Sequence, residues 1–382
     1  MKRAKEFKDV YLRRLKTGVI TSPYLLEAGI TPVTNLIMIL SNISERIYVI
    51  SGCSGHKLPN NKHVYRHIVA EKTPNTNFKP VYYFYDCLKI MFHIIKLRDE
   101  VKIWFFFLGE IPLIIPIAIS KALNKHVILM FSGSPNNFLK YRKKSHFTRF
   151  LEYIARLNMH LSDYIIVYSS RIRDEHNFDK YKSKTIIASE HFLDLNIFRV
   201  MKPFNERNRK IIGYIGRLEE EKGIFNLIKA MEFLDKDILL FIYGDGTLRP
   251  IIENYLLKNN LKNVQLFGWI SHSELPKKLN DLRLLILPSF TEGLPNVMLE
   301  GMACGTPILS TPVGSILDVI TEGNTGFIMR NNSPECISDS IVRVLNHPDI
   351  AKISENACSF VNINYTYEKA VEKFKRIFKI IE

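Results

Sequence analysis

Short apolar runs alternate with segments of helical periodicity along the second half of the chain. The apolar runs have the length of β-strands, and they cover residues 211–215, 238–243, 264–267, 284–287 and 307–310. Helical patterns separate them at residues 224–232, 249–258, 274–279 and 296–303, and a final helical pattern covers residues 367–381. Strands that alternate with helices in this way predict a parallel sheet with helices on both faces.

The first half of the chain shows the same alternation. Its apolar or β-branched runs cover residues 47–51, 103–108, 127–131, 164–168 and 185–188, and its helical patterns lie near residues 33–40, 113–123 and 149–161. A polar segment, residues 201–210, separates the halves and is interpreted as a linker. We therefore expect an α/β fold of two doubly wound, Rossmann-like domains that face each other across a cleft.

The length of 382 residues also favours two domains over a single core. We expect an N-terminal domain of residues 1–203 and a C-terminal domain of residues 204–364. A C-terminal helix at residues 365–382 is expected to pack back on the first domain.

The excess positive charge lies in the first half of the chain. Residues 1–200 contain 31 of the 53 Lys and Arg but 16 of the 38 Asp and Glu, which leaves 22 of each for the second half. Lys140, Arg142, Lys143 and Lys144 form one basic cluster, and aromatic residues are interleaved with it. This mixture favours an anionic membrane surface as a partner, and a solvated basic face is the alternative. Nucleic acid is not expected, because no nucleic-acid-binding signature accompanies the charge.

The cysteines and the apolar stretches indicate the cellular location of the protein. Five scattered cysteines without a close pair favour neither disulfides nor a zinc site, which suggests a reducing, cytoplasmic setting. The longest apolar stretch, residues 104–120, contains glycine, glutamate and proline, so it is interpreted as a buried strand followed by a helix. No cleavable signal peptide is recognised. We expect a cytoplasmic protein that is peripheral on the inner face of the cell membrane.

Two carboxylates, Glu292 and Glu300, lie eight positions apart across a Gly-Leu-Pro turn and the start of the helix expected at residues 296–303. Glu292 is expected in the loop and Glu300 within the helix, within about 10 Å of the helix N-terminus. Amides at such a helix end suit phosphate, and carboxylates beside them suit sugar hydroxyls. Taken alone, the pair is explained more simply by a helix cap and a solvated helical residue.

Further loops follow the strands of the second half at the same expected sheet edge. Gly216, Arg217 and Lys222 follow the first of these strands. Two cations before a helix suit a diphosphate, and the alternative is a surface ion pair between Lys222 and a neighbouring glutamate. Gly244 belongs to a Tyr-Gly-Asp-Gly segment that an ordinary turn explains equally well. Ile270 ends a Phe-Gly-Trp-Ile segment that is placed to wall a base.

These residues resemble the donor domain of family 4 retaining glycosyltransferases, the group 1 glycosyl transferases with the GT-B fold. The resemblance rests on segments that occur in the family's order: GRLEEEKG (216–223), YGDG (243–246), LFGWI (266–270), PSFTEGLPNVMLEGMACGTPIL (288–309) and TEGNTGFIM (321–329). It covers residues 211–330 closely, and the Glu-x7-Glu element is the family's hallmark. The first half of the chain matches the family only weakly.

The resemblance implies a role for each of these residues. Arg217 and Lys222 would hold the donor diphosphate and neutralise charge as the nucleoside diphosphate leaves. Glu300 would bind the ribose hydroxyls, and Glu292 would hold hydroxyls of the donor sugar. Further donor contacts are implied for Gly216, Gly244, Ile270, Gly293, Leu294, Pro295 and Asn296. The family implies catalysis without a metal or another cofactor, with the nucleoside-diphosphate sugar as co-substrate.

The first half departs from the family's pattern on the acceptor side. The expected double-glycine loop reads Glu-Ala-Gly and ends at Gly29, with one glycine replaced. The Phe-Ser-Gly-Ser segment at residues 131–134 lacks the family's histidine. Glu190 stands where the family usually has Asn-Gly. We therefore expect an acceptor side near Gly29, Ser132 and Glu190.

The resulting expectation is a retaining glycosyltransferase that moves a sugar to a glycan or lipid-linked acceptor, in the synthesis of a cell-surface polysaccharide, glycolipid or glycoprotein. Two alternatives stay open: a relative of the same fold that acts as a nucleotide-sugar epimerase or hydrolase, and a catalytically inactive partner that binds nucleotide sugar. A nicotinamide-dependent oxidoreductase is not favoured, because no Gly-x-Gly-x-x-Gly opens a helix after a strand. Asp235 and Asp237 precede their expected strand and are interpreted as a turn, not as a metal site.

Overall fold

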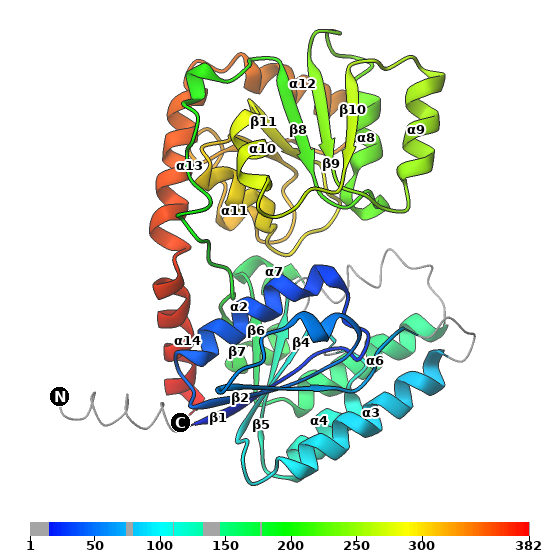
Figure 1. Ribbon diagram of the computed structural model, residues 1–382, viewed down its shortest axis with the longest axis vertical. Coiled ribbons are helices and arrows are strands. Elements are labelled where there is room, and N and C mark those ends of the chain that lie inside the picture. The colour runs from blue at the N-terminus through cyan, green and yellow to red at the C-terminus, as the bar shows by residue number, and fades with distance from the viewer. Residues whose placement is uncertain (1–14, 74–78, 110, 133–145, 176–177, 382) are drawn as a thin grey trace, which may run out of the picture. The chain divides into compact units, whose positions relative to one another are not determined.

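The computed structural model describes residues 15–73, 79–109, 111–132, 146–175 and 178–381 (Figure 1). The chain divides into two compact units. The first comprises the residues up to Phe192 together with those from Tyr367 onward, and the second comprises Leu193–Thr366. Each unit is built around one parallel sheet, so the expected α/β class is confirmed.

A seven-stranded parallel sheet in the order β3-β2-β1-β4-β5-β6-β7 forms the first unit. Its strands are β1 (Lys16–Ile20), β2 (Arg46–Ser51), β3 (Val64–Ile68), β4 (Ile103–Phe107), β5 (His126–Phe131), β6 (Tyr164–Val167) and β7 (Thr185–Ile187). Its helices are α2 (Ile30–Ser41), α3 (Lys79–Lys96), α4 (Ile114–Ala122), α6 (His146–Leu161), α7 (Ser170–Glu175) and α14 (Tyr367–Ile381). The strand order reverses between β1 and β4, which makes this pair a topological switch point.

The core of the first unit is built around β4, the central strand of its sheet. All five residues of this strand, IWFFF, are buried. The Trp104 ring lies so close to β1 that a Cβ at Gly18 would be 2.0 Å from it, which explains the glycine there. From α14, Phe374 and Phe378 pack against Phe105, with ring centroids 6.4 and 6.0 Å away. The C-terminal helix is therefore part of this core.

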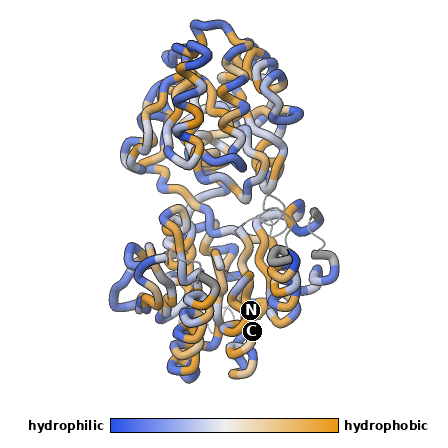
Figure 2. Tube along the Cα trace, turned by 90° about the vertical axis from the view of Figure 1, so that its right-hand side faces the viewer, coloured by the Kyte–Doolittle hydropathy of each residue, from blue (hydrophilic) through white to orange (hydrophobic). Residues whose placement is uncertain are grey.

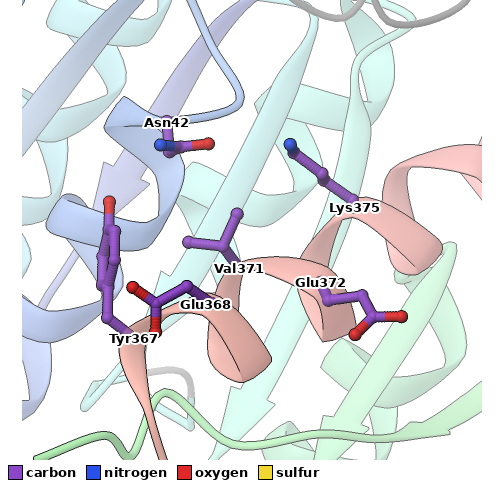
Figure 3. Close-up of a pocket in the computed structure, with 6 residues that line it drawn as sticks. All are labelled: Asn42, Tyr367, Glu368, Val371, Glu372 and Lys375. Atoms are coloured by element: carbon purple, nitrogen blue, oxygen red, sulfur yellow. The ribbon is translucent and has the colours of Figure 1, made fainter.

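α14 also packs beside α2. The Tyr367 hydroxyl donates a 2.9 Å hydrogen bond to the Met38 carbonyl, and a small pocket opens next to this contact (Figure 3). The residues that line the pocket are Asn42, Tyr367, Glu368, Val371, Glu372 and Lys375. Because Asn42 precedes β2, the pocket lies at the amino ends of the strands, whereas doubly wound sheets bind ligands at the carboxyl ends. It is therefore not a candidate for the ligand site.

A six-stranded parallel sheet in the order β10-β9-β8-β11-β12-β13 forms the second unit. Its strands are β8 (Ile211–Ile215), β9 (Leu239–Tyr243), β10 (Val264–Gly268), β11 (Leu284–Leu287), β12 (Ile308–Ser310) and β13 (Phe327–Ile328). Its helices are α8 (Ile224–Ala230), α9 (Arg249–Lys258), α10 (Leu275–Asp281), α11 (Asn296–Ala303), α12 (Pro334–Leu345) and α13 (Ile350–Asn364). Here the order reverses between β8 and β11.

The polar segment at residues 201–210, interpreted from the sequence as a linker, is fixed to the second unit. The backbone amides of residues 201 and 202 donate to Asn280 Oδ1 at 2.7 and 3.1 Å. Arg207 is buried, and its guanidinium donates to Thr306 Oγ1 at 2.9 Å. The Leu193 amide donates to the Tyr365 carbonyl at 2.9 Å, so residues 193–203, which the sequence placed in the first domain, belong to the second unit.

The apolar stretch at residues 104–120 folds as β4 followed by α4. Within the ranges that the structure describes, the helices lack the combination of length and apolar character that a bilayer crossing requires. All five cysteines carry free thiols.

Candidate functional site

The loops after β8 and β11 meet at the switch point of the second sheet. The two strands are direct neighbours, with Ile212 opposite Leu284, and both loops leave the carboxyl ends of their strands. Doubly wound sheets bind ligands in this place. The β8 loop carries Arg217 and Lys222, and the β11 loop carries Glu292. Thus the fold brings together three residues that the sequence singled out.

Lys222 and Glu292 form an ion pair across these loops. Lys222 Nζ donates to both carboxylate oxygens of Glu292, at 2.7 and 2.8 Å, and the Ser289 hydroxyl donates to Oε1 at 2.7 Å. The Glu292 side chain is 10% exposed and the Lys222 side chain 20%. Partial burial strengthens the attraction between the charges, and Ser289 satisfies a further lone pair. The carboxylate is thereby held in one orientation at the sheet edge.

Backbone contacts fix the loops around this ion pair. The Phe290 amide donates a 2.9 Å hydrogen bond to the Glu221 carbonyl, which ties the β11 loop directly to the β8 loop. On the other side lies Gly314, whose φ of +58° falls in the left-handed region. A Cβ at Gly314 would lie 2.1 Å from the Glu292 carbonyl oxygen. A side chain at Gly314 would therefore displace the backbone that carries Glu292.

Arg217 is the exposed cation of the β8 loop. Its Nη2 lies 2.9 Å from Glu221 Oε1, and both side chains are partly in solvent. The loop backbone is anchored by Tyr214, whose buried hydroxyl donates to the Arg217 carbonyl at 2.7 Å. Burial raises the pKa of Tyr214 well above its ordinary value, so this hydroxyl keeps its proton. Because exposed ion pairs are weak, an anion can compete with Glu221 for the guanidinium.

The Tyr-Gly-Asp-Gly turn after β9 packs against the β8 loop. Gly244 has a φ of +140°, and a Cβ there would lie 1.9 Å from the Gly216 carbonyl oxygen. The Gly216 amide donates to the Tyr243 carbonyl at 3.0 Å. The turn therefore holds the backbones of two strand-end loops in close contact, directly before Arg217.

α11 begins without a side-chain cap. Its N-cap residue, Pro295, has extended backbone and makes no side-chain hydrogen bond. The Glu292 carboxylate, which the simpler interpretation assigned to capping, is occupied by Lys222 and Ser289 instead. Leu294 and Pro295 are buried, whereas Gly293 and Asn296 are half-buried. An uncapped helix start beside a lysine suits an anion.

Glu300 lies on α11 and is buried, so it is not a solvated helical residue. His272 Nε2 lies 3.4 Å from Glu300 Oε1, and this hydrogen bond raises the pKa of His272. The ring of Phe198 packs edge-on against His272, with centroids 5.1 Å apart. His272 therefore positions Glu300, and the Phe198 ring packs against His272.

Ile270 follows β10 and is half-buried, beside the exposed Trp269. The β10 end is tied to the turn after β9, because the Gly244 amide donates to the Gly268 carbonyl at 2.7 Å. Phe267 stacks on Tyr243 with ring centroids 4.9 Å apart. The predicted wall for a base thus lies next to the turn at Gly244.

On the first unit, Gly29, Ser132 and Glu190 follow three different strands. Gly29 ends the loop after β1, Ser132 directly follows β5, and Glu190 comes after β7. Strands β1 and β7 are separated by three others, which at about 4.8 Å a strand places them roughly 19 Å apart. The structure therefore places all three residues at one sheet edge without bringing Gly29 and Glu190 into contact.

Glu190 is a buried carboxyl group. It is 1% exposed, and the Tyr168 hydroxyl donates to its Oε1 at 2.5 Å. Its Oε2 has no hydrogen-bond partner among the described residues. Burial raises the pKa of Glu190 to about 7, because the low-dielectric surroundings disfavour the charged form.

The basic cluster of Lys140, Arg142, Lys143 and Lys144 lies outside the described residues. Within the described part of the chain, no three His, Cys, Asp or Glu side chains gather closely enough to hold a metal ion. Asp235 forms a turn in which its carbonyl accepts a 3.0 Å hydrogen bond from the Ile238 amide. Asp237 pairs with Lys210. The pair of aspartates is therefore engaged in local structure.

Two site residues escaped the sequence analysis. Ser289 precedes Glu292 by three positions, and Ser-x-x-Glu is the signature of a capping box, which was a usable signal. Here the serine contacts the glutamate side chain itself instead of a helix amide. His272 carried no local signal, because only the fold brings it to Glu300, 28 residues further along the chain.

The chain is similar in sequence to known glycosyltransferases. The family model described as Glycosyl transferases group 1 matches residues 198–359. An uncharacterized glycosyltransferase of Methanocaldococcus jannaschii is 30% identical over 241 residues, which are 58% of this chain and 67% of the relative. The alpha-D-kanosaminyltransferase of Streptomyces kanamyceticus is 25% identical over 280 residues, 71% of each chain.

Solved structures show the same fold. HepE of Anabaena, in complex with UDP, matches with a TM-score of 0.75 over 96% of this chain and 99% of its own, at 14% sequence identity. At this identity the likeness concerns the fold alone, and it confirms the expected GT-B class.

Proposed function

Because the chain belongs to the glycosyl transferases of group 1, we propose that it moves a sugar from a nucleoside-diphosphate sugar to an acceptor hydroxyl with retention of the anomeric configuration. Glycosyl transfer follows from the family, whereas the donor, the acceptor and the stereochemistry are the proposal. The observation that supports it most is the ion pair between Lys222 and Glu292 beside the uncapped start of α11.

The cations of the β8 loop are assigned to the diphosphate. Lys222 is held in place by Glu292, and Arg217 is engaged only by its exposed pair with Glu221. A diphosphate therefore meets one fixed cation and one that can turn toward it. Together with the first amides of α11 they stabilise the charge that develops as the nucleoside diphosphate leaves. Since two cations already face that charge, we propose that no metal ion or other cofactor is required.

The carboxylates are assigned to hydroxyl groups of the donor. Glu292 accepts hydrogen bonds from the sugar, and Glu300 accepts from the ribose. The β11-loop residues Gly293, Leu294, Pro295 and Asn296 surround the sugar and phosphate, and Gly216, Gly244 and Ile270 line the nucleoside side. The acceptor hydroxyl passes its proton to an oxygen of the leaving phosphate as the new glycosidic bond forms, so this step needs no side-chain base.

The solved structure of HepE suggests which nucleotide base of the donor to test first. HepE of Anabaena has been solved with UDP and with UDP-glucose, so uridine donors are the first to test here. The acceptor is proposed to be a glycan or a lipid-linked glycan bound on the first unit near Gly29, Ser132 and Glu190. The scattered cysteines support a location in the cytoplasm, and the excess of basic residues in the first half of the chain supports a peripheral position on an anionic membrane.

Calorimetric titration with UDP, GDP, UDP-glucose and GDP-mannose tests the donor site. The wild type should bind one nucleotide class, and Lys222→Ala should weaken binding by about tenfold or more through loss of a charge-assisted contact. Equal binding by Lys222→Ala would overturn the assignment of Lys222.

Product analysis separates transfer from the alternative reactions. Incubation of the labelled donor with and without acceptor distinguishes transfer from hydrolysis or epimerisation. Nuclear magnetic resonance of the product then reports its anomeric configuration. A product of inverted configuration would contradict the retaining mechanism.

A further inference from the structure

α3 presents apolar side chains on two opposite faces. Its buried face includes Cys87, Ile90 and Ile94. At about 100° per residue, the opposite face carries Val81, Tyr85, Leu88, Phe92 and Ile95, which follow one another at intervals of four, three, four and three residues. Leu88 is half-buried, and the other four are 38 to 63% exposed. Tyr82 and Phe84 widen this outward face and are exposed as well.

We call the exposed residues Val81, Tyr82, Phe84, Tyr85, Phe92 and Ile95 the α3 stripe. A surface helix normally turns charged or polar residues outward and keeps one apolar face for the core. α3 departs from this rule between Val81 and Ile95, over a length of about 21 Å. Contiguous exposed apolar surface of this kind marks an interaction site.

The neighbouring helices extend the same surface. α3 packs beside α4, and α4 packs beside α6. α4 has a single charged residue, Lys121, and its Ala118 and Ala122 are exposed. On α6, Phe150 and Tyr153 are exposed, together with Arg149 and Arg156. Figure 2, turned toward the side on which α3 and α6 lie in Figure 1, shows hydrophobic stretches along helices of the first unit.

The solvent-accessible charges described on α3 are basic. The only acidic residue of α3, Asp86, is buried and accepts a 2.9 Å hydrogen bond from Lys89. Lys89 also lies over the Tyr85 ring, 4.6 Å from its centroid, and Lys96 at the end of α3 is exposed. Tyrosine and phenylalanine flanked by lysine and arginine are the composition that binds the interface of a bilayer. The first half of the chain, with 31 basic and 16 acidic residues, adds long-range attraction to anionic lipid.

We propose that the α3 stripe docks on an anionic lipid bilayer, with α4 and α6 beside it. This inference rests on the proposed function, which places the enzyme on an anionic membrane, and it names the surface that binds that membrane. It differs from the basic cluster at residues 140–144, because the α3 stripe contributes apolar contact instead of charge alone.

The position of the stripe connects it to the acceptor side. Tyr24, in the loop after β1, packs edge-on against Tyr83 of α3, with ring centroids 5.5 Å apart. Burial and the nearby Asp86 raise the pKa of Tyr24 far above its ordinary value. The first turns of α3 therefore adjoin the loop that ends at Gly29, at the carboxyl edge of the sheet. A bilayer bound to the stripe lies next to this loop, which fits an acceptor anchored in lipid.

Vesicle co-flotation of the full-length protein tests the proposal. The vesicles contain equal parts of phosphatidylcholine and phosphatidylglycerol, or phosphatidylcholine alone. The test variant is Phe84→Ser/Tyr85→Ser/Phe92→Ser, which changes exposed side chains and leaves the net charge unchanged. The matched control is Phe233→Ser/Leu257→Ser, which removes exposed apolar side chains from the second unit. Thermal melting checks the fold of each variant, and calorimetry with UDP or GDP checks the donor site.

The wild type and the control should bind the anionic vesicles, and the α3 variant should bind about tenfold more weakly or worse, since three apolar side chains no longer leave water. Full binding by the α3 variant, or no binding by the wild type, overturns the proposal. So does a wild-type dimer that the α3 variant converts to monomer without a change in vesicle binding, because a second copy then occupies the stripe. Vesicle binding without nucleotide binding would instead overturn the proposed function and leave the docking surface standing.

Discussion

Lys222 Nζ lies 2.7 and 2.8 Å from the two carboxylate oxygens of Glu292, although the residues are 70 positions apart in the chain. The ammonium group bridges both oxygens, so the carboxylate can neither rotate freely nor be left as an uncompensated charge. Each residue thereby positions the other at the switch point of the second sheet.

Lys222→Ala and Glu292→Gln should each lower kcat by about 10² to 10³ with little loss of fold, because each removes a preorganised group from the transition state. Calorimetry first identifies the donor. Steady-state kinetics with that donor then measure kcat for each variant. Lys210→Ala is the matched control, since it removes a lysine from an ion pair with Asp237 away from the site. A variant at either position with wild-type kcat would refute the shared role.

His272 should make the stability of the second unit depend on pH. Its hydrogen bond to Glu300 raises its pKa above the usual value of 6.5. The contact therefore stabilises the folded state fully below pH 6.5, and this contribution is lost as the pH rises through the raised pKa. His272→Gln, which cannot be charged, should melt below the wild type by a larger margin at about pH 5.5 than at about pH 8.5. Melting followed by circular dichroism measures the margin, and a margin that does not vary with pH contradicts the ion pair.

Glu190 should also make stability fall as the pH rises, here in the first unit, because its charged form is disfavoured by burial. Its pKa is raised from 4.5 to about 7 by burial, so the folded state holds a proton that the unfolded chain has released between these values. Wild-type stability therefore falls as the pH rises from about 4.5 to about 7. Glu190→Gln removes this loss and should be the more stable form at about pH 8, by roughly 2–3 kcal/mol. Its advantage should vanish at about pH 4.5.

Urea unfolding at several pH values measures this difference, with Glu355→Gln as a control for an exposed carboxylate. Tyr168→Phe offers a second check. The Tyr168 hydrogen bond lowers the pKa of Glu190, so its removal should raise that pKa further and extend the loss of stability to higher pH. An equal pH dependence in the wild type and Glu190→Gln would show that Glu190 is charged in the folded protein.

The sequence predicted residues 211–310 of the second unit well, because the strands there are short, apolar and bounded by glycine and proline. The segment around Glu292 shows this: β11 ends at Leu287 and α11 begins at Asn296, as Pro288 and the helical pattern indicated. The sequence missed β13, α12 and α13. What the pattern could not show is which charged residues meet. Lys222 had two nearby glutamates as simple partners, yet it pairs with Glu292 because β8 and β11 are neighbours in the sheet.

The first unit was harder to predict, and α3 shows why. Hydrophobic periodicity identifies a helix only when one face is polar, and α3 is apolar on two opposite faces. The strands β1 and β3 were missed as well. β1 contains Gly18, which is a poor strand former and is present because the Trp104 ring fills its space. The glycine of β1 is thus explained by a tertiary contact, and the outward apolar face of α3 by the proposed contact with a bilayer. Local propensity explains neither.

Arg207 should be a strong determinant of the stability of the second unit. The buried guanidinium donates to the carbonyls of Leu282 at 3.2 Å and Cys304 at 2.6 Å, and to Thr306 Oγ1 at 2.9 Å. Arg207→Ala leaves these acceptors buried without a donor, at a cost of about 1–3 kcal/mol for each one that water cannot reach. We expect the free energy of opening to fall by about 2–4 kcal/mol.

Hydrogen exchange with mass spectrometry measures this loss unit by unit. In Arg207→Ala, peptides from β8, β11 and β12 should exchange faster, whereas peptides from β4 and β5 of the first unit should keep the wild-type rate. Arg343→Ala is the control: it removes an arginine whose ion pair with Glu322 is exposed, and it should cost less than about 1 kcal/mol. Equal exchange in the wild type and Arg207→Ala would mean that water replaces the guanidinium and that Asn280 and Arg283 hold residues 201–210 to the second unit without it.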